Sequence, residues 1–274
     1  MYRNLAPSIV AVACFLANTA TADTFNSEVK LQLADNNSYS VSLSPNYRYY
    51  LNAVDDSFGP LEMAGFLNQT SSIFTSFQNT NLPRYSAYSH ALSGSVEADF
   101  VFENGVNLGL GGVQERWYFD SSQNPLVLNV DTKQLDFGYY INQFNHINLG
   151  YQSMSSSEDQ TMKTFILKGI SLIPLTESRY LKLEAVVKKA DHIANVWDSQ
   201  SIELDTTYYP QYNLGLSAGL DYTVYGEQNN QIIYSLGTQY FFDTDFYAAI
   251  NMNMIMQGCE NWSSQQIMSL GARF

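Results

Sequence analysis

The feature that most constrains the fold is a strict alternation of large apolar side chains with small or polar ones. From Tyr212 to Gly226, the stretch YNLGLSAGLDYTVYG has large apolar groups at nearly every even position and Asn, Gly, Ser, Asp or Thr at the odd ones. Successive side chains of a β-strand point to opposite faces, so this stretch predicts a two-faced strand. Segments 232–242 and 247–256 repeat the pattern.

The length of these runs decides between two environments for the apolar face. Strands of ordinary globular sheets have about five or six residues, whereas a membrane-spanning strand needs about nine to eleven. The runs have the membrane length, so we expect the apolar face to contact lipid. The alternative is an exported soluble β-sandwich, which would have shorter strands with a turn about every 8 to 12 residues.

The first residues predict export. Arg3 precedes an apolar stretch at 9–17, and the small residues Ala20, Thr21 and Ala22 follow it, which is typical of a secretory signal peptide cleaved after Ala22. Lipoprotein processing at Cys14 is a weaker alternative, because the apolar stretch before it is short. We therefore expect a signal peptide at 1–22 and a mature chain at 23–274.

Charge and hydropathy exclude several classes of protein. The formal net charge is -13, and removal of Arg3 with the leader makes it more negative, which argues against a nucleic-acid partner. Beyond the leader, no apolar run approaches the roughly 18 to 20 residues of a membrane helix. A closed barrel is the only sheet that satisfies its backbone hydrogen bonds in lipid. The 20 tyrosines and 16 phenylalanines suit its aromatic girdles.

Reading strands along the chain predicts an all-β protein, a single antiparallel transmembrane β-barrel of about fourteen strands in one domain. An even number of strands places both chain termini of a bacterial barrel in the periplasm. The first three strands are the least regular, so twelve remains the alternative. The expected strands are 27–34, 38–51, 66–79, 86–103, 105–119, 126–141, 145–153, 160–172, 177–190, 197–209, 211–225, 230–242, 245–257 and 262–274.

Segment 46–73 departs from this pattern and carries a resemblance to a known family. It contains Tyr49-Tyr50 at the end of a strand, then Gly59-Pro60, then the sequence AGFLN at 64–68. In this order the elements resemble the putative porin family of Gram-negative bacterial outer-membrane β-barrels. The resemblance implies an outer-membrane barrel and carries over no catalytic residue.

The sequence GPLEMAGFL within this segment predicts a short helical or turn-like plug in a long periplasmic connection. Its apolar side chains are expected to tuck under the barrel wall, and a structural lid is favoured over a ligand site. These side chains are Leu61, Met63, Phe66 and Leu67.

The C-terminus ends on Phe274, with Ala272, Leu270 and Met268 on the same face. This ending resembles the C-terminal strand signal by which the outer-membrane assembly machinery recognises its barrels. We therefore expect localisation in the bacterial outer membrane, with outer-membrane lipid and the barrel-assembly machinery as partners.

The sequence predicts no enzyme chemistry. The three histidines, His90, His146 and His192, fall on separate segments and form no Ser/His/acid or metal-ligating pattern. Glu158 and Asp159 are best explained as a solvated acidic loop. We expect no catalytic residue, no metal and no cofactor.

The remaining interpretation is a channel. On the clearer strands, the charged residues that alternate with the apolar face should point inward. They give a lumen with seven acidic and five basic residues, a net charge of about -2. Acidic loop residues should make the mouth negative as well; they are Glu158, Asp159, Glu227 and Glu260. We expect passive diffusion of small hydrophilic solutes with weak cation preference. The alternatives are charges that pair across the lumen and only hold its shape, and a non-conducting adhesin or envelope-structural barrel. The predicted lumen residues are Arg48, Glu97, Asp99, Asp136, Lys168, Lys182, Glu184, Lys188, Glu203, Asp205, Asp221 and Arg273.

Overall fold

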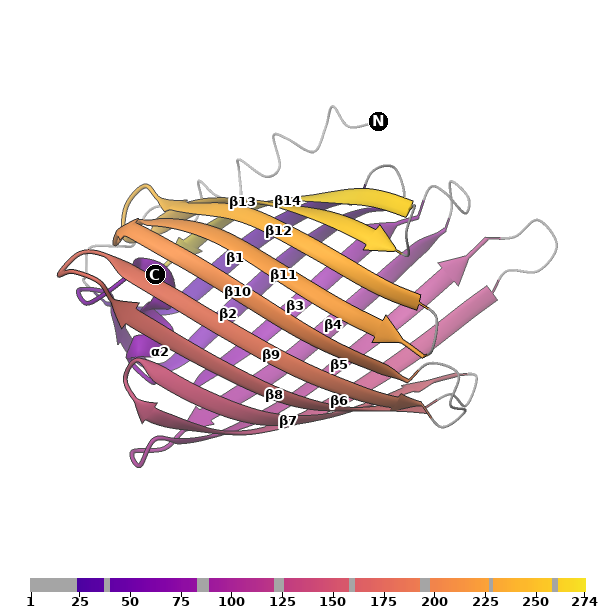
Figure 1. Ribbon diagram of the computed structural model, residues 1–274, viewed down its shortest axis with the longest axis horizontal. Helices are drawn as coiled ribbons and strands as arrows, with labels where there is room; N and C mark the ends of the chain where they lie inside the picture. Colours follow the sequence, from indigo (N-terminus) through magenta and orange to yellow (C-terminus); the bar gives the residue numbers. More distant parts are fainter. Residues whose placement is uncertain are drawn as a thin grey trace.

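The protein is a closed barrel of fourteen antiparallel strands, each paired with its neighbour in the chain, and β14 pairs with β1 (Figure 1). The computed structural model describes residues 24–36, 40–82, 89–120, 126–157, 161–192, 198–226, 229–257 and 261–274, so the expected leader at 1–22 lies outside it. The strands are β1 (Thr24–Asn36), β2 (Ser40–Asp55), β3 (Ser72–Asn81), β4 (His90–Val101), β5 (Val106–Phe119), β6 (Leu126–Asn142), β7 (Asn145–Ser156), β8 (Thr161–Pro174), β9 (Tyr180–His192), β10 (Ser199–Gln211), β11 (Leu214–Tyr225), β12 (Asn229–Phe241), β13 (Phe246–Gln257) and β14 (Asn261–Arg273).

The alternation in sequence becomes two faces of the wall. On β11, Leu216, Leu220 and Tyr222 are exposed on the outer face, while residues of the opposite parity, such as Asp221, point inward. The strands have 10 to 17 residues, enough to cross the hydrocarbon layer when tilted. The predicted number of fourteen is confirmed, and the alternative of twelve is wrong.

The barrel closes where its first and last strands meet. β1 pairs with β14 from Glu28 opposite Arg273 to Asp35 opposite Gln266. The backbone of Phe274 completes the seam, because its carbonyl accepts from the amides of Asn26 and Ser27, at 3.1 and 2.9 Å. Closure leaves no unpaired strand edge, as a barrel in lipid requires.

One predicted strand begins too early. The expected strand 66–79 is observed as β3, which begins only at Ser72. Before it, the 3-10 helix η2 (Leu61–Met63) runs directly into the one-turn helix α2 (Ala64–Leu67). The helical hydrogen bonds of 61–68 and the positive φ of Gln69 prevent an extended backbone there. No helix in the described ranges is long and apolar enough to cross a membrane.

The two ends of the barrel differ. Tight turns join strands at the end where β1 begins, β14 ends and α2 lies, for example between β4 and β5 and between β10 and β11 (Figure 1). In bacterial barrels this end lies in the periplasm. Large aromatic side chains near this end face outward, as an aromatic girdle does; they include Tyr49, Phe102, Tyr139 and Phe242.

Candidate functional site: the barrel interior

A plug formed by η2 and α2, residues 61–67, lies inside the turn end of the barrel. Its apolar side chains pack against inward-facing residues of the wall in three clusters. Leu61 and Ala64 are almost completely buried. The helical plug therefore agrees with the expectation from GPLEMAGFL. The wall residues in the clusters are Leu172, Tyr180 and Tyr209; Phe25, Tyr50 and Val54; and Phe241 and Tyr247.

Polar contacts fix the plug to the wall. The Tyr209 hydroxyl donates to the Glu62 carboxylate, at 3.1 Å, and the Leu61 amide donates to the Tyr212 carbonyl, at 2.9 Å. Gly65 faces the Tyr50 ring so closely that a Cβ at this position would lie 2.8 Å from it. A glycine is needed here because any side chain would push the helix away from the wall.

Arg273 is the most buried of the predicted lumen residues, at 4% exposure. Its guanidinium lies 4.6 Å from the ring centroids of both Phe25 and Phe241, and it donates to the Leu61 carbonyl at 2.8 Å. It also pairs with Glu28 at 3.1 Å. Arg273 therefore lies inside the barrel but holds the plug rather than bordering open space, an arrangement that strand parity alone could not distinguish.

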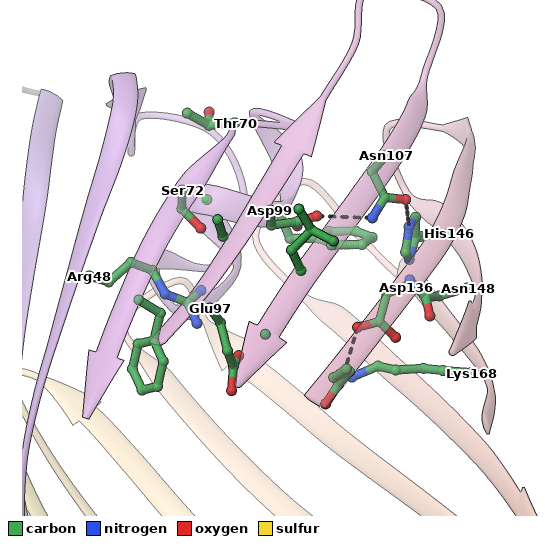
Figure 2. A pocket seen from close by; sticks show the side chains of 18 of the residues that line it. Arg48, Thr70, Ser72, Glu97, Asp99, Asn107, Asp136, His146, Asn148 and Lys168 are labelled. Carbon is green, nitrogen blue, oxygen red and sulfur yellow. Dashed lines mark hydrogen bonds between the residues drawn. The ribbon is translucent and has the colours of Figure 1, made fainter. Parts of the chain in front are cut away.

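A cavity of about 360 Å³ lies between the plug and the wall, with Gly65 and Phe66 of α2 among its lining residues. Five of the predicted residues line it: Arg48 from β2, Glu97 and Asp99 from β4, Asp136 from β6 and Lys168 from β8. Figure 2 shows Arg48 beside Glu97 and Lys168 near Asp136, while Asp99 points toward Asn107.

Neutral side chains orient the carboxylates of the cavity. The Asn107 amide donates to Asp99 at 3.1 Å, and its oxygen lies 2.8 Å from Nε2 of His146. The Gln134 amide donates to Asp136 at 2.6 Å. Asn107 and Gln134 are uncharged and so fall outside the charged lumen residues predicted from sequence, although the alternation of β5 and β6 places both inward.

Beyond the cavity, β8, β9 and β10 carry a line of ion pairs. Lys168 and Lys182 both contact Glu184, at 2.6 and 2.8 Å, and Lys188 contacts Glu203 at 2.5 Å. Each of these pairs lies within one strand or joins neighbouring strands. The pairs therefore run along the wall and do not cross the lumen.

Several inward acids have no such partner. In the described part of the chain, no lysine or arginine forms an ion pair with Glu97, Asp99 or Asp136, nor with Asp205 or Asp221 on the wall of β10 and β11. Among the predicted cations, only Arg48 forms no ion pair in those same ranges, and it lies 5.3 Å from the Phe74 ring.

Met268, Leu270 and Ala272 share the outward parity of β14 but differ in exposure. Met268 and Leu270 are exposed on the outer face, Ala272 is buried opposite Phe246, and Phe274 is half-buried at the seam. The predicted mouth residues Glu158, Asp159, Glu227 and Glu260 lie outside the described residues, as does the His192 side chain. Within the described ranges, no three His, Cys, Asp or Glu side chains are grouped as a metal site would need.

An apolar outer wall, a charged interior and a closed antiparallel sheet define an outer-membrane β-barrel of the porin class. The chain belongs to the porin family described as "putative general bacterial porin", whose sequence profile matches residues 3–274. It is thus a bacterial outer-membrane protein, as predicted. A comparison with curated proteins gave no significant match.

Solved structures show the same fold. The outer-membrane protein Omp33 of Acinetobacter baumannii superposes with a TM-score of 0.60 at 18% identity, over 93% of this chain and 100% of Omp33. A bacterial polysaccharide outer membrane secretin superposes with a TM-score of 0.55 at 9% identity, over 91% of this chain and 98% of the secretin. At these identities the likeness extends to the fold alone.

Proposed function

We propose that the protein is a passive channel through which small hydrophilic solutes diffuse, with a weak preference for cations and no catalytic role. Family membership supports the porin class. The observation that carries the finer proposal is the imbalance of unpaired charge: five inward acids and one inward base of the predicted set form no ion pair in the described part of the chain.

Lys188 is held beside Glu203, so the fields of this pair largely cancel within a few ångströms. Lys168 and Lys182 share Glu184, so this group keeps one net positive charge, against the five inward carboxylates that form no ion pair within the described ranges. Asp99 and Asp136 accept from neutral amides and Glu97 forms no ion pair with a described residue, so their negative field extends into the lumen. These carboxylates would stabilise a cation that passes the cavity, as rings of acidic side chains do in cation-selective pores.

The plug limits what can pass. Its three clusters contact wall residues of β1, β2, β8, β9, β10, β12 and β13, so it narrows the mouth at the turn end. Within this proposal, solutes pass beside the plug through the polar cavity rather than through a wide aqueous pore. Small hydrophilic solutes are therefore the expected substrates.

The decisive experiment is single-channel recording in a planar bilayer with a salt gradient. The wild type should conduct, and its zero-current potential should indicate weak cation preference. Glu97→Gln/Asp136→Asn should reduce that preference. Glu103→Gln/Asp243→Asn removes the same charge from exposed turns and serves as the matched control. Equal potentials for wild type and the lumen variant would contradict the proposed ion path.

A second candidate is a non-conducting barrel with an adhesive or envelope-structural role. The contacts of the plug around the mouth favour it. A wild type that inserts into the bilayer with the gel mobility of a folded barrel but gives no current would select this candidate.

A further inference from the structure

Basic side chains on the outer wall are confined to one arc of the barrel. On the described strands, outward-facing lysine or arginine occurs only on β5, β6, β8 and β9, at Arg116, Lys133, Lys163 and Lys189. All four are exposed. We call these residues the basic arc. The formal net charge of the protein is -13, so this local concentration of positive charge runs against the overall composition.

The strand register aligns the centre of the arc. Lys133 on β6 is opposite Ser153 on β7, and Ser153 is opposite Lys163 on β8. Neighbouring strands are about 4.8 Å apart, so the backbones of the two lysines are about 10 Å apart. The register continues to Asp191 on β9, which pairs with Lys189 at 3.2 Å. Lys133 and Lys163 themselves form no ion pair with any described residue.

The arc lies where the apolar belt ends. On the outer face, Lys133 is the next residue after Leu135, and Lys163 is the next after Phe165. A lysine facing the middle of the hydrocarbon would destabilise a barrel by about 2–4 kcal/mol, whereas the cost falls to about 0–1 near the interface. These lysines therefore belong at the headgroup level, at the barrel end opposite the plug (Figure 1). With the turn end in the periplasm, this end faces the outer leaflet.

A hollow of about 940 Å³ adjoins the arc on the outer wall of β3 to β6. Gly94 and Gly112 face outward there and leave its floor without side chains, while Phe77 and Val96 form an apolar side. Arg116 and Lys133 line the hollow on its other side, together with Gln114 and the carboxylate of Asp131, which accepts from the Gln114 amide at 3.0 Å. An apolar side with a cationic rim suits an acyl chain attached to an anionic headgroup.

We propose that the basic arc and this hollow bind lipopolysaccharide, with phosphate groups of its lipid anchor on Lys133, Lys163 and Arg116 and an acyl chain in the hollow. The outer leaflet of the outer membrane consists largely of this phosphorylated glycolipid. Basic pockets on membrane proteins bind lipid phosphates in the same way. The site is independent of conduction, because its side chains point away from the lumen.

The test compares binding of purified, detergent-solubilised full-length protein to fluorescent deep-rough lipopolysaccharide. Lys133→Gln and Lys163→Gln should each weaken binding about fivefold, and the double variant roughly 25-fold, given the usual contribution of a basic residue near an anionic lipid surface. The matched control is Arg179→Gln, which removes an exposed cation at the turn end and should leave the affinity unchanged. Dephosphorylated lipopolysaccharide should compete poorly with the intact form.

The outcomes separate the proposal from its alternatives. Unchanged affinity in the double variant, an equal loss in Arg179→Gln, or equal competition by dephosphorylated lipid would each overturn it. Equal competition by phosphatidylglycerol micelles would also overturn it, because it would show attraction to any anionic lipid. Unheated gel mobility establishes that each variant is folded. Unchanged conductance of the double variant would keep this result distinct from the proposed channel function.

Discussion

The guanidinium of Arg273 donates to the carbonyl of Leu61, 212 positions earlier in the chain, and so ties the last strand to the plug. The same group pairs with Glu28 on the first strand. One side chain therefore connects β14, β1 and the plug at the seam where the barrel closes. Three aromatic rings surround it and exclude water, which strengthens both contacts.

Replacement of Arg273 by glutamine should destabilise the barrel. The change leaves Glu28 without its cation and weakens the contact to Leu61, and the loss of one member of a buried pair costs about 3–5 kcal/mol. Urea unfolding in vesicles, followed by gel mobility, measures the free energy of unfolding. Arg179→Gln, at an exposed turn, should change it by less than about 0.5 kcal/mol. A similarly small change in the free energy of unfolding of both variants would show that Arg273 does not stabilise the seam.

Tyr209→Phe should loosen the plug without disturbing the wall. The substitution removes one hydroxyl, and with it the hydrogen bond to Glu62, which is worth about 1.5–3 kcal/mol for a charged acceptor. We expect larger or more variable single-channel currents, because the plug narrows the mouth. Tyr208→Phe is the control, since Tyr208 belongs to the same strand with the opposite parity. Identical current records for the two variants would show that this contact does not hold the plug in place.

Much of the wall could be predicted from sequence because a strand in a barrel has only two faces. The parity of Ile202 and Leu204 on the outer face places Glu203 and Asp205 inward without any knowledge of their neighbours. Strand number followed from the same rule. Family membership was also recoverable, from the spacing of segment 46–73.

The interior of the barrel could not be predicted in the same way. Contacts such as Tyr209 with Glu62 join residues 147 positions apart, and no local pattern encodes them. Parity places Arg273 inward, yet its burial depends on the path of the plug. The predicted start of β3 was wrong for a related reason. The apolar residues of 61–67 form helical turns that are buried inside the barrel, and they do not alternate along a strand.

Phe274→Ala should separate the side chain of the last residue from its backbone. The backbone hydrogen bonds to Asn26 and Ser27 remain possible in this variant, whereas deletion of the residue removes them. If the aromatic ring is part of the assembly signal, the yield of membrane-inserted protein should fall severalfold. Phe242→Ala, at a highly exposed phenylalanine of the outer wall, is the matched control. Equal yields from the two variants would exclude the ring from the signal.

Glu203→Lys/Asp205→Lys should shift the ion preference of the channel toward anions. Glu203 pairs with Lys188, whereas Asp205 forms no ion pair among the described residues. The double change therefore adds two cations and leaves the Lys188 ammonium without its partner. The zero-current potential in a salt gradient should move toward the anion side. Glu103→Lys/Asp243→Lys makes the same charge change in exposed turns, so a smaller shift is expected there.

The shift should depend on ionic strength, because fields in a water-filled lumen are screened over about 10 Å at 0.1 M salt and about 3 Å at 1 M. Faster migration of the unheated protein on a detergent gel checks that the variant still forms a closed barrel. A variant that inserts normally and conducts with unchanged selectivity would show that residues 203 and 205 do not face the ion path. If the wild type also gives no current, the structural or adhesive barrel becomes the better explanation of this charged wall.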